Sequence, residues 1–336
     1  MIETIYVEEE IYEHPRTLKI LSRFKSHRII LIKRFSEIFN HRKQNFPVQK
    51  INPALILARK HNSHILEAPK GFGIGGTKNY YFSHMYNCVY DCRYCFLQGM
   101  YSSANYVIFV NYEDFDRGIE STIKEHPNEK VTFFSGYDCD SLALENITGF
   151  VAHILPLFEK HPTSLIEFRT KSIQIKPFVS TNVINNCIIA YSLMPELISR
   201  ALEHRTPSVK KRIEVMCQLA ELGWKVGLRF DPLIHGRDWK SLYKDLIEYV
   251  FGAIPHEAIH SVSFGPLRFP KAMYRQIFKL YPDDKLFAGP LDKGSSVVAY
   301  HPDIEAEMAD FCRQMFANFI PESIVFRCMS GGQTIE

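Results

Sequence analysis

Apolar runs and amphipathic stretches alternate along the middle of the chain, from residue 80 to about residue 280. Short runs rich in Val, Ile, Phe and Tyr predict buried strands, and apolar positions three or four residues apart predict helices between them. The predicted strands cover residues 80–86, 106–110, 131–135, 165–170, 185–192, 225–229 and 261–264. The predicted helices cover residues 112–124, 146–159, 210–222, 239–250 and 270–279.

This alternation predicts a parallel sheet, because consecutive parallel strands need a crossover that is usually a helix. About six repeats indicate an α/β fold, an incomplete (β/α)6 TIM-type barrel with N-terminal and C-terminal extensions. We expect a basic accessory region over residues 1–75, the partial barrel over 76–280 and an extension over 281–336. Within the extension we expect a loop at 281–300, a helix at 301–319 and a final strand at 322–328.

Composition is ordinary for a soluble globular protein, with 46% hydrophobic and 23% charged residues in a chain of 336. No apolar stretch is long enough to cross a membrane, and the acidic N-terminus lacks the features of a signal peptide. We therefore expect a cytoplasmic protein without membrane contact. Eight cysteines in such a chain indicate metal binding or catalysis rather than disulfides.

Positive charge is concentrated near the N-terminus, although the net charge of the chain is only +3. Residues 16–50 contain ten Lys or Arg side chains and a single acid, Glu37, interleaved with apolar residues. The pattern fits one or two short amphipathic helices, or a helix and a strand. Such a basic face could contact phosphates or could simply be solvated, and charge by itself does not separate these readings.

Three cysteines lie close together in the spacing C-x3-C-x2-C, at Cys88, Cys92 and Cys95. Three thiolates on a cubane [4Fe–4S] cluster leave one iron free to bind another ligand. The alternative is a zinc site, which would need a fourth Cys or His at knuckle spacing. His84 lies on the wrong side of the cysteines for the usual zinc patterns, so the cluster is the favoured reading.

The cysteine spacing, with an aromatic residue after the third cysteine, resembles the radical S-adenosylmethionine (radical SAM) superfamily. That resemblance implies a radical SAM barrel in which SAM chelates the open iron. Further motifs narrow the resemblance to the spore photoproduct lyase family. They are Phe96-Leu97-Gln98-Gly99, Gly136-Tyr137-Asp138-Cys139-Asp140-Ser141, Phe168-Arg169-Thr170-Lys171, Ile189-Ala190-Tyr191-Ser192 and Thr206-Pro207-Ser208 with Lys211-Arg212-Ile213-Glu214.

The resemblance implies a lyase that repairs a thymine photodimer in ultraviolet-damaged DNA. A 5′-deoxyadenosyl radical abstracts hydrogen from the lesion, and a cysteine matched by Cys139 returns a hydrogen atom to the thymine radical. Ser141, Lys171 and Ser192 match positions that contact SAM, and Tyr94 matches a tyrosine that passes the radical back to SAM. The resemblance also implies an electron donor such as flavodoxin or ferredoxin.

Two departures limit what the resemblance implies. Phe96 stands where the family has a second relay tyrosine, and a phenyl ring has no O–H hydrogen to give. The segment 286–296, where the family has a basic hairpin that enters DNA, carries a single lysine and an acid. Any DNA contact would therefore fall to the N-terminal basic region or to Lys210, Lys211 and Arg212.

Two alternatives remain open from these departures. One keeps the radical chemistry but changes the substrate to another nucleotide, a tRNA base or a small metabolite. The other is a non-enzymatic iron–sulfur or zinc protein that binds nucleic acid through its basic N-terminal region.

Overall fold

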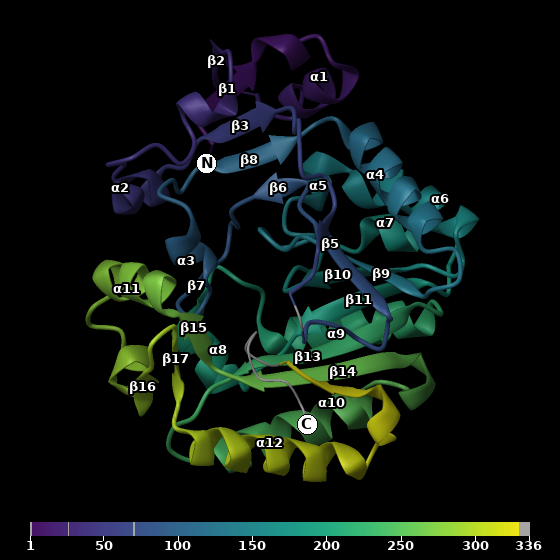
Figure 1. Cartoon of the computed structure of the whole chain (residues 1–336), viewed down its shortest axis with the longest axis vertical. Helices are drawn as coiled ribbons and strands as arrows, with labels where there is room; N and C mark the ends of the chain where they lie inside the picture. Colours follow the sequence, from purple (N-terminus) through teal and green to yellow (C-terminus); the bar gives the residue numbers. More distant parts are fainter. Residues whose placement is uncertain (1, 26, 70, 329–336) are drawn as a thin grey trace.

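The computed structural model describes residues 2–25, 27–69 and 71–328. The last residues of the predicted C-terminal extension, 329–336, lie outside this range. Two sheets dominate the molecule, and Figure 1 shows the N-terminal sheet at one end and two long helices at the other.

The larger sheet is the expected partial barrel. Its parallel strands follow one another in chain order, and a short strand, β4 (Leu66–Glu67), joins its edge in the antiparallel direction. Six strands make the predicted repeats and a seventh, β18, extends the sheet. They are β5 (Lys78–Phe82), β9 (Val131–Ser135), β10 (Leu165–Thr170), β11 (Cys187–Ser192), β13 (Lys225–Leu233), β14 (Ile259–Pro266) and β18 (Val325–Arg327).

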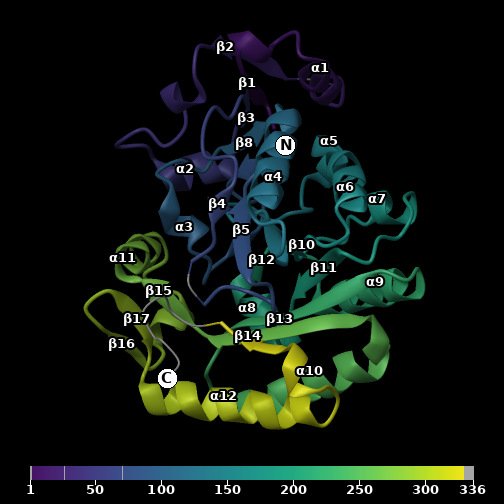
Figure 2. The ribbon, with the colours of Figure 1, turned by 45° about the vertical axis from the view of Figure 1, so that its right-hand side comes forward.

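Amphipathic helices cover the outer side of this sheet, as the periodicity predicts. Figure 2 shows α6, α7 and α9 together on one side of the sheet. Proline or serine at the start of several helices explains where they begin. The helices are α4 (Tyr112–Glu125), α5 (Glu145–Thr148), α6 (Phe150–Lys160), α7 (Lys176–Val179), α8 (Glu196–Leu202), α9 (Val209–Glu221), α10 (Trp239–Ala253) and α12 (Pro302–Ala317).

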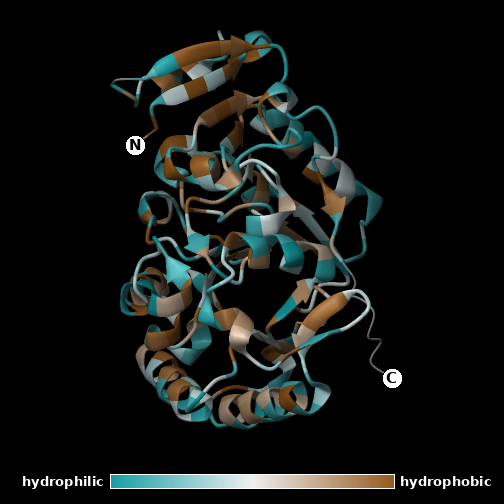
Figure 3. Ribbon diagram, turned by 90° about the vertical axis from the view of Figure 1, so that its left-hand side faces the viewer, coloured by the Kyte–Doolittle hydropathy of each residue, from teal (hydrophilic) through white to brown (hydrophobic). Residues whose placement is uncertain are grey.

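A second sheet of five strands has the order β2-β1-β3-β8-β6. Figure 3 colours much of this sheet as hydrophobic, and β3 is buried along its whole length. Strand β8 belongs here, paired with β3, and not in the barrel as the sequence predicted. The elements are β1 (Thr4–Glu8), α1 (Pro15–Leu21), β2 (Arg28–Ile32), α2 (Phe46–Ile51), β3 (Leu55–Ala58), β6 (Met85–Tyr86) and β8 (Tyr106–Phe109).

The segment 281–300, predicted to be a loop, contains two strands. They form a three-stranded antiparallel sheet of β15 (Arg268–Pro270), β16 (Leu291–Lys293) and β17 (Val297–Tyr300). Helix α11 (Lys271–Leu280) packs against the short helix α3 (Leu97–Met100). A Cβ atom on Gly99 would lie 2.9 Å from the Met273 carbonyl oxygen, so this close packing requires glycine.

One strand face of the barrel carries a buried ion pair instead of apolar side chains. The Arg229 guanidinium donates to both oxygens of Glu167 at 3.2 and 2.8 Å and also to the Ser261 hydroxyl at 2.9 Å. Arg229 and Glu167 are completely buried, and the nearby arginines hold the pKa of Glu167 near 2 although burial alone would raise it. Within the described residues, no helix is long and apolar enough to span a membrane.

Candidate functional site

A cavity of about 650 Å³ opens at the C-terminal ends of the barrel strands, the end where barrel enzymes hold their reactive groups. Its wall is built from residues at the C-terminal ends of β9, β10 and β11 or just after them, and from the cysteine loop, residues 87–98. Residues of α2, β15 and β17 complete its rim. Cys88, Cys92, Cys95 and Cys139 all line this one cavity.

Backbone pairing and a side-chain amide hold the cysteine loop in shape. Asn87 has a positive φ of 65°, and its amide donates to the carbonyls of Ser103 and Asn105 at 2.7 Å each. Strand β7 (Asp91–Cys92) pairs with β12 (Glu203–His204), which places Cys92 opposite Glu203. The loop is therefore anchored both to the N-terminal sheet and to the segment between α8 and α9.

The sulfurs of the three cysteines are not gathered as closely as a single metal ion would require. In the described part of the chain, only Glu8, Glu10 and His61 bring three ligand atoms within 4.8 Å of one another. A single zinc holds its sulfurs at about 2.3 Å, so three ligating sulfurs would have to lie closer together than that limit. Burial raises the pKa of all three thiols, to about 12 for Cys92, so ligation must displace protons from them.

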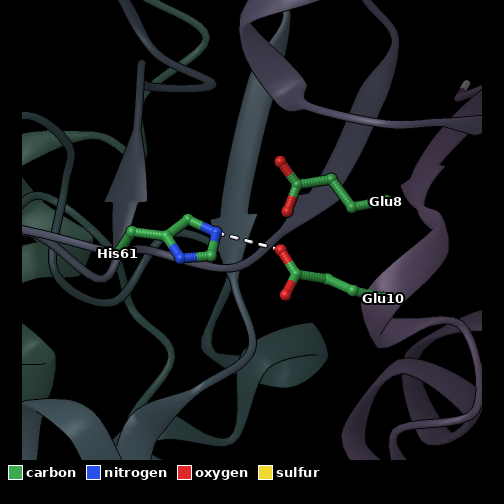
Figure 4. Close-up of side chains that lie close together, drawn as sticks. All are labelled: Glu8, Glu10 and His61. Atoms are coloured by element: carbon green, nitrogen blue, oxygen red, sulfur yellow. Dashed lines mark hydrogen bonds and ion pairs between the residues drawn. The ribbon is translucent and has the colours of Figure 1, made fainter.

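The cluster of Glu8, Glu10 and His61 is a different kind of site, and Figure 4 shows the three side chains facing one another. The Glu8 carboxylate accepts backbone N–H groups from Phe35 at 2.6 Å and Arg59 at 2.8 Å. Glu10 pairs with Arg34 at 2.6 Å and with His61 at 2.9 Å. These partners already satisfy the carboxylates, so the cluster joins β1 to its neighbours and holds no evident metal site.

A tight turn after β9 (residues 136–141) carries Cys139 into the cavity wall. Gly136 has a φ of +74°, and a Cβ there would lie 2.6 Å from the Ser141 hydroxyl, so only glycine fits. The Cys139 N–H donates to the Gly136 carbonyl at 3.2 Å and the Asp138 N–H donates to the Ser83 hydroxyl at 3.1 Å. Cys139 is 7% exposed, and burial raises the pKa of its thiol well above the ordinary value. The thiol therefore keeps its hydrogen at neutral pH.

Ser141 does not reach the cavity. Its side chain is 1% exposed, and its hydroxyl donates to the Ser135 carbonyl at 2.7 Å. Ser141 therefore shapes the turn, and a direct contact with a ligand has no support from its position. Lys171 and Ser192, the other two side chains expected to hold SAM, both line the cavity.

Asp140, which the motif contained but to which no role was assigned, joins this turn to the end of β10. Its carboxylate accepts from the Thr170 hydroxyl at 2.6 Å, the Lys171 N–H at 2.7 Å and the Leu142 N–H at 3.0 Å. Burial nevertheless raises its pKa. Asp140 thus fixes Cys139 and Lys171 relative to each other across two neighbouring strand ends.

A buried carboxylate, Glu203, lies behind the cavity wall and joins several of its side chains. It accepts from the Tyr94 hydroxyl, from Ser199 at 2.7 Å and from Arg212 at 2.6 Å, and Lys171 lies 3.8 Å away. Burial would raise the pKa of Glu203, but Lys171 and Arg212 lower it overall, so it is charged. Ion pairs of this kind leave no sequence signature, because their members meet only in the folded chain.

Arg212 is completely buried, so the expectation that it contacts DNA is wrong. Its guanidinium is used inside the protein, where it also donates to the Ser192 and Pro207 carbonyls at 3.0 Å each. Lys210 and Lys211, on the same helix, are exposed. In the N-terminal basic region Arg16, Arg34 and Lys50 form ion pairs within the protein, whereas other cations are exposed: Lys19, Lys25, Arg28, Lys33, Arg42 and Lys43.

Aromatic rings form one wall of the cavity. The ring of Tyr137 lies 5.6 Å from that of Phe96, 4.3 Å from that of Tyr81 and 6.3 Å from that of Phe72, measured between centroids. The Arg169 guanidinium lies 5.1 Å from the centre of the Phe72 ring. Flat apolar rings beside a cation suit a planar, electron-rich ligand such as a nucleobase.

Comparisons with known proteins agree on one family. A family model described as spore photoproduct lyase matches residues 1–295. The spore photoproduct lyase of Bacillus subtilis (strain 168) is 25% identical over 202 residues, 59% of each chain. That of Clostridium acetobutylicum (strain ATCC 824) is 25% identical over 217 residues, 64% of this chain and 63% of the relative. The chain thus spans about three fifths of the length of these curated relatives.

Solved structures share the fold over nearly the whole chain. A double variant of a spore photoproduct lyase with bound S-adenosylmethionine and dinucleoside spore photoproduct has a TM-score of 0.85 at 16% identity, covering 98% of both chains. A spore photoproduct lyase complexed with dinucleoside spore photoproduct has a TM-score of 0.83 with the same coverage. At this identity the likeness confirms the fold, a partial barrel with extensions at both ends.

Proposed function

The chain belongs to the spore photoproduct lyase family, and we propose that it is a radical SAM lyase that repairs a thymine photodimer in DNA. One observation carries the proposal: a three-cysteine loop and a separate buried thiol face one cavity at the C-terminal end of the barrel. A metal-binding protein without catalysis would need the three ligands but would have no use for the fourth thiol.

Cys88, Cys92 and Cys95 would hold a [4Fe–4S] cluster, and Lys171 and Ser192 would hold SAM beside it. When bound, these groups supply a carbon-centred radical that abstracts hydrogen from the lesion. Lys171 remains positively charged in its buried position, because Cys92 and Glu203 raise its pKa although burial opposes the charge. A lysine cation there can pair with a carboxylate, and the Ser192 hydroxyl can bond a ribose hydroxyl.

Cys139 would return the hydrogen atom to the repaired thymine. Its raised pKa keeps the S–H bond intact, and the turn of residues 136–141 fixes its position in the cavity wall. The aromatic wall and the Arg169 guanidinium would receive the two bases of the lesion. A dinucleoside spore photoproduct occupies structurally similar enzymes, which supports this choice of substrate. An electron donor of the flavodoxin or ferredoxin type remains part of the proposal.

The test uses reconstituted protein, dithionite, SAM and dinucleoside spore photoproduct. We expect about four iron and four sulfide per chain, formation of 5′-deoxyadenosine and release of the repaired dinucleoside. Cys139→Ala should still form 5′-deoxyadenosine but divert the lesion to other products. A fully loaded protein that forms 5′-deoxyadenosine but leaves the dinucleoside unchanged would reject this substrate. A loaded protein that leaves SAM intact would reject the enzyme class.

A further inference from the structure

This inference rests on the proposed function, because it concerns how the Cys139 thiol is refilled after each repair. Once Cys139 has given its hydrogen atom, a thiyl radical remains at a side chain that is only 7% exposed. A second turnover needs a neighbouring group that can give a hydrogen atom to this sulfur. Phenol O–H and thiol S–H bonds are of similar strength, so a tyrosine in contact with the cavity is the suitable donor.

In the part of the chain that the structure describes, four tyrosines line the cavity: Tyr90, Tyr94, Tyr106 and Tyr137. The Tyr94 hydroxyl donates to the buried Glu203 carboxylate. Tyr90 pairs with Ser172. Tyr106 packs in the apolar cluster that contains Cys139, but it is only 7% exposed. The Tyr94 and Tyr90 hydroxyls are therefore hydrogen-bonded, and Tyr106 is buried.

Tyr137 differs from the other three in each of these respects. It precedes Cys139 by two residues on the same tight turn, so their Cα atoms are at most about 7.6 Å apart. Its hydroxyl has no hydrogen-bond partner among the described residues, and its side chain is partly exposed. Burial raises the pKa of Tyr137, so the phenol keeps its hydrogen. Its ring lies 5.6 Å from that of Phe96, a side chain with no hydroxyl to give.

We infer that Tyr137 gives a hydrogen atom to the Cys139 thiyl radical, a role that Phe96 cannot fill because its ring has no hydroxyl. In this step the Tyr137 O–H bond breaks homolytically and the Cys139 S–H bond forms, which leaves a phenoxyl radical on Tyr137. One electron from a low-potential one-electron reductant and one proton from water then restore the phenol. The electron and the proton can reach Tyr137 because its side chain is partly exposed, whereas Cys139 is buried.

The experiment separates the first turnover from later ones, with dinucleoside spore photoproduct, SAM and dithionite as the reactants. Tyr137→Phe should keep a first turnover of about one repaired dinucleoside per chain, because Cys139 starts with its own hydrogen. Its steady rate should then fall by about tenfold or more, beyond the change expected of a small packing defect. Freeze-quenched wild type should show the electron paramagnetic resonance signal of a tyrosyl radical. The signal should narrow when the protein is labelled with ring-deuterated tyrosine, and it should be missing from Tyr137→Phe.

Two further variants make the result specific to this residue. Phe96→Tyr in the Tyr137→Phe background should recover steady turnover, since it returns a hydroxyl to the adjoining ring. Tyr106→Phe should behave as wild type. An unchanged steady rate in Tyr137→Phe, a lost first turnover, or the defect appearing in Tyr106→Phe instead would overturn the assignment. Wild type that forms 5′-deoxyadenosine without repairing the dinucleoside would overturn the proposed substrate as well, so the two failures are distinguishable.

Discussion

Replacing Arg212 by methionine tests whether the buried Glu203–Arg212 pair holds the cysteine loop in place. Both side chains are essentially unexposed, at 0% and 1%, and the closest N···O distance is 2.6 Å. Methionine fills similar space, but among the described residues it leaves Lys171, at 3.8 Å, as the one cation paired with the Glu203 carboxylate. Because β12 pairs with β7, disturbing Glu203 should also loosen Cys92.

The size of the effect follows from burial. Two unit charges about 4 Å apart attract by about 4 kcal/mol at an effective dielectric of 20. Removing one partner of a buried pair costs about 3–5 kcal/mol of unfolding free energy, because the remaining charge is stranded. Lys171 compensates part of this, so we expect Arg212→Met to lose about 3 kcal/mol.

Urea unfolding of the cluster-free protein, followed by tryptophan fluorescence, measures this loss, since Trp224 and Trp239 both lie in the barrel core. Lys211→Met is the matched control on the same helix, and as an exposed position it should change stability by less than about 0.5 kcal/mol. Glu203→Gln combined with Arg212→Met should be less damaging than the sum of the single changes by about 1–3 kcal/mol. Additive single changes, or a loss below about 1 kcal/mol, would refute the role assigned to this pair.

Three other outcomes follow from the site. Lys171→Met should weaken SAM binding to the loaded protein by about tenfold or more in calorimetry, and an unchanged affinity would remove Lys171 from the site. Gly136→Ala should lower stability by about 1–3 kcal/mol, since the new Cβ meets Ser141 at a positive φ; a neutral effect in urea unfolding would contradict the turn geometry. Burial raises the pKa of Glu145 to about 7 from 4.5, so the folded state holds its proton more tightly. Its contribution to stability is then complete below pH 4.5 and lost as pH rises to about 7. The free energy of unfolding of wild type should therefore fall by about 3 kcal/mol over that pH window, and Glu145→Gln should remove this fall. Parallel pH–stability curves for wild type and the variant would show that Glu145 is not its source.

Much of the barrel could be predicted from the sequence because its signals are local. Runs such as residues 187–191 are continuously apolar, as strands buried on both faces must be, and the helices between the strands carry clear periodicity. The cysteine spacing and the strand-end motifs also lie within short segments. The family and the fold expected from them are confirmed.

What the sequence could not supply depends on contacts between distant segments. Strand β8 has the same apolar character as a barrel strand, and nothing in its four residues says which sheet it joins. Strands β16 and β17 are too short to show alternation, so their segment reads as loop. Arg212 resembles any basic helix residue until Glu203 is found beside it. Likewise, only the fold places Tyr137 against Phe96.

Three thiols are proposed to hold a [4Fe–4S] cluster whose fourth iron stays open to SAM. Electron paramagnetic resonance of the dithionite-reduced protein, recorded with and without SAM, tests it most directly. We predict a reduced-cluster signal whose g-values shift when SAM is added, and whose intensity is lost in Cys92→Ala. A cluster signal that SAM leaves unchanged would mean that no iron is open to it, and the account of this site would then be wrong.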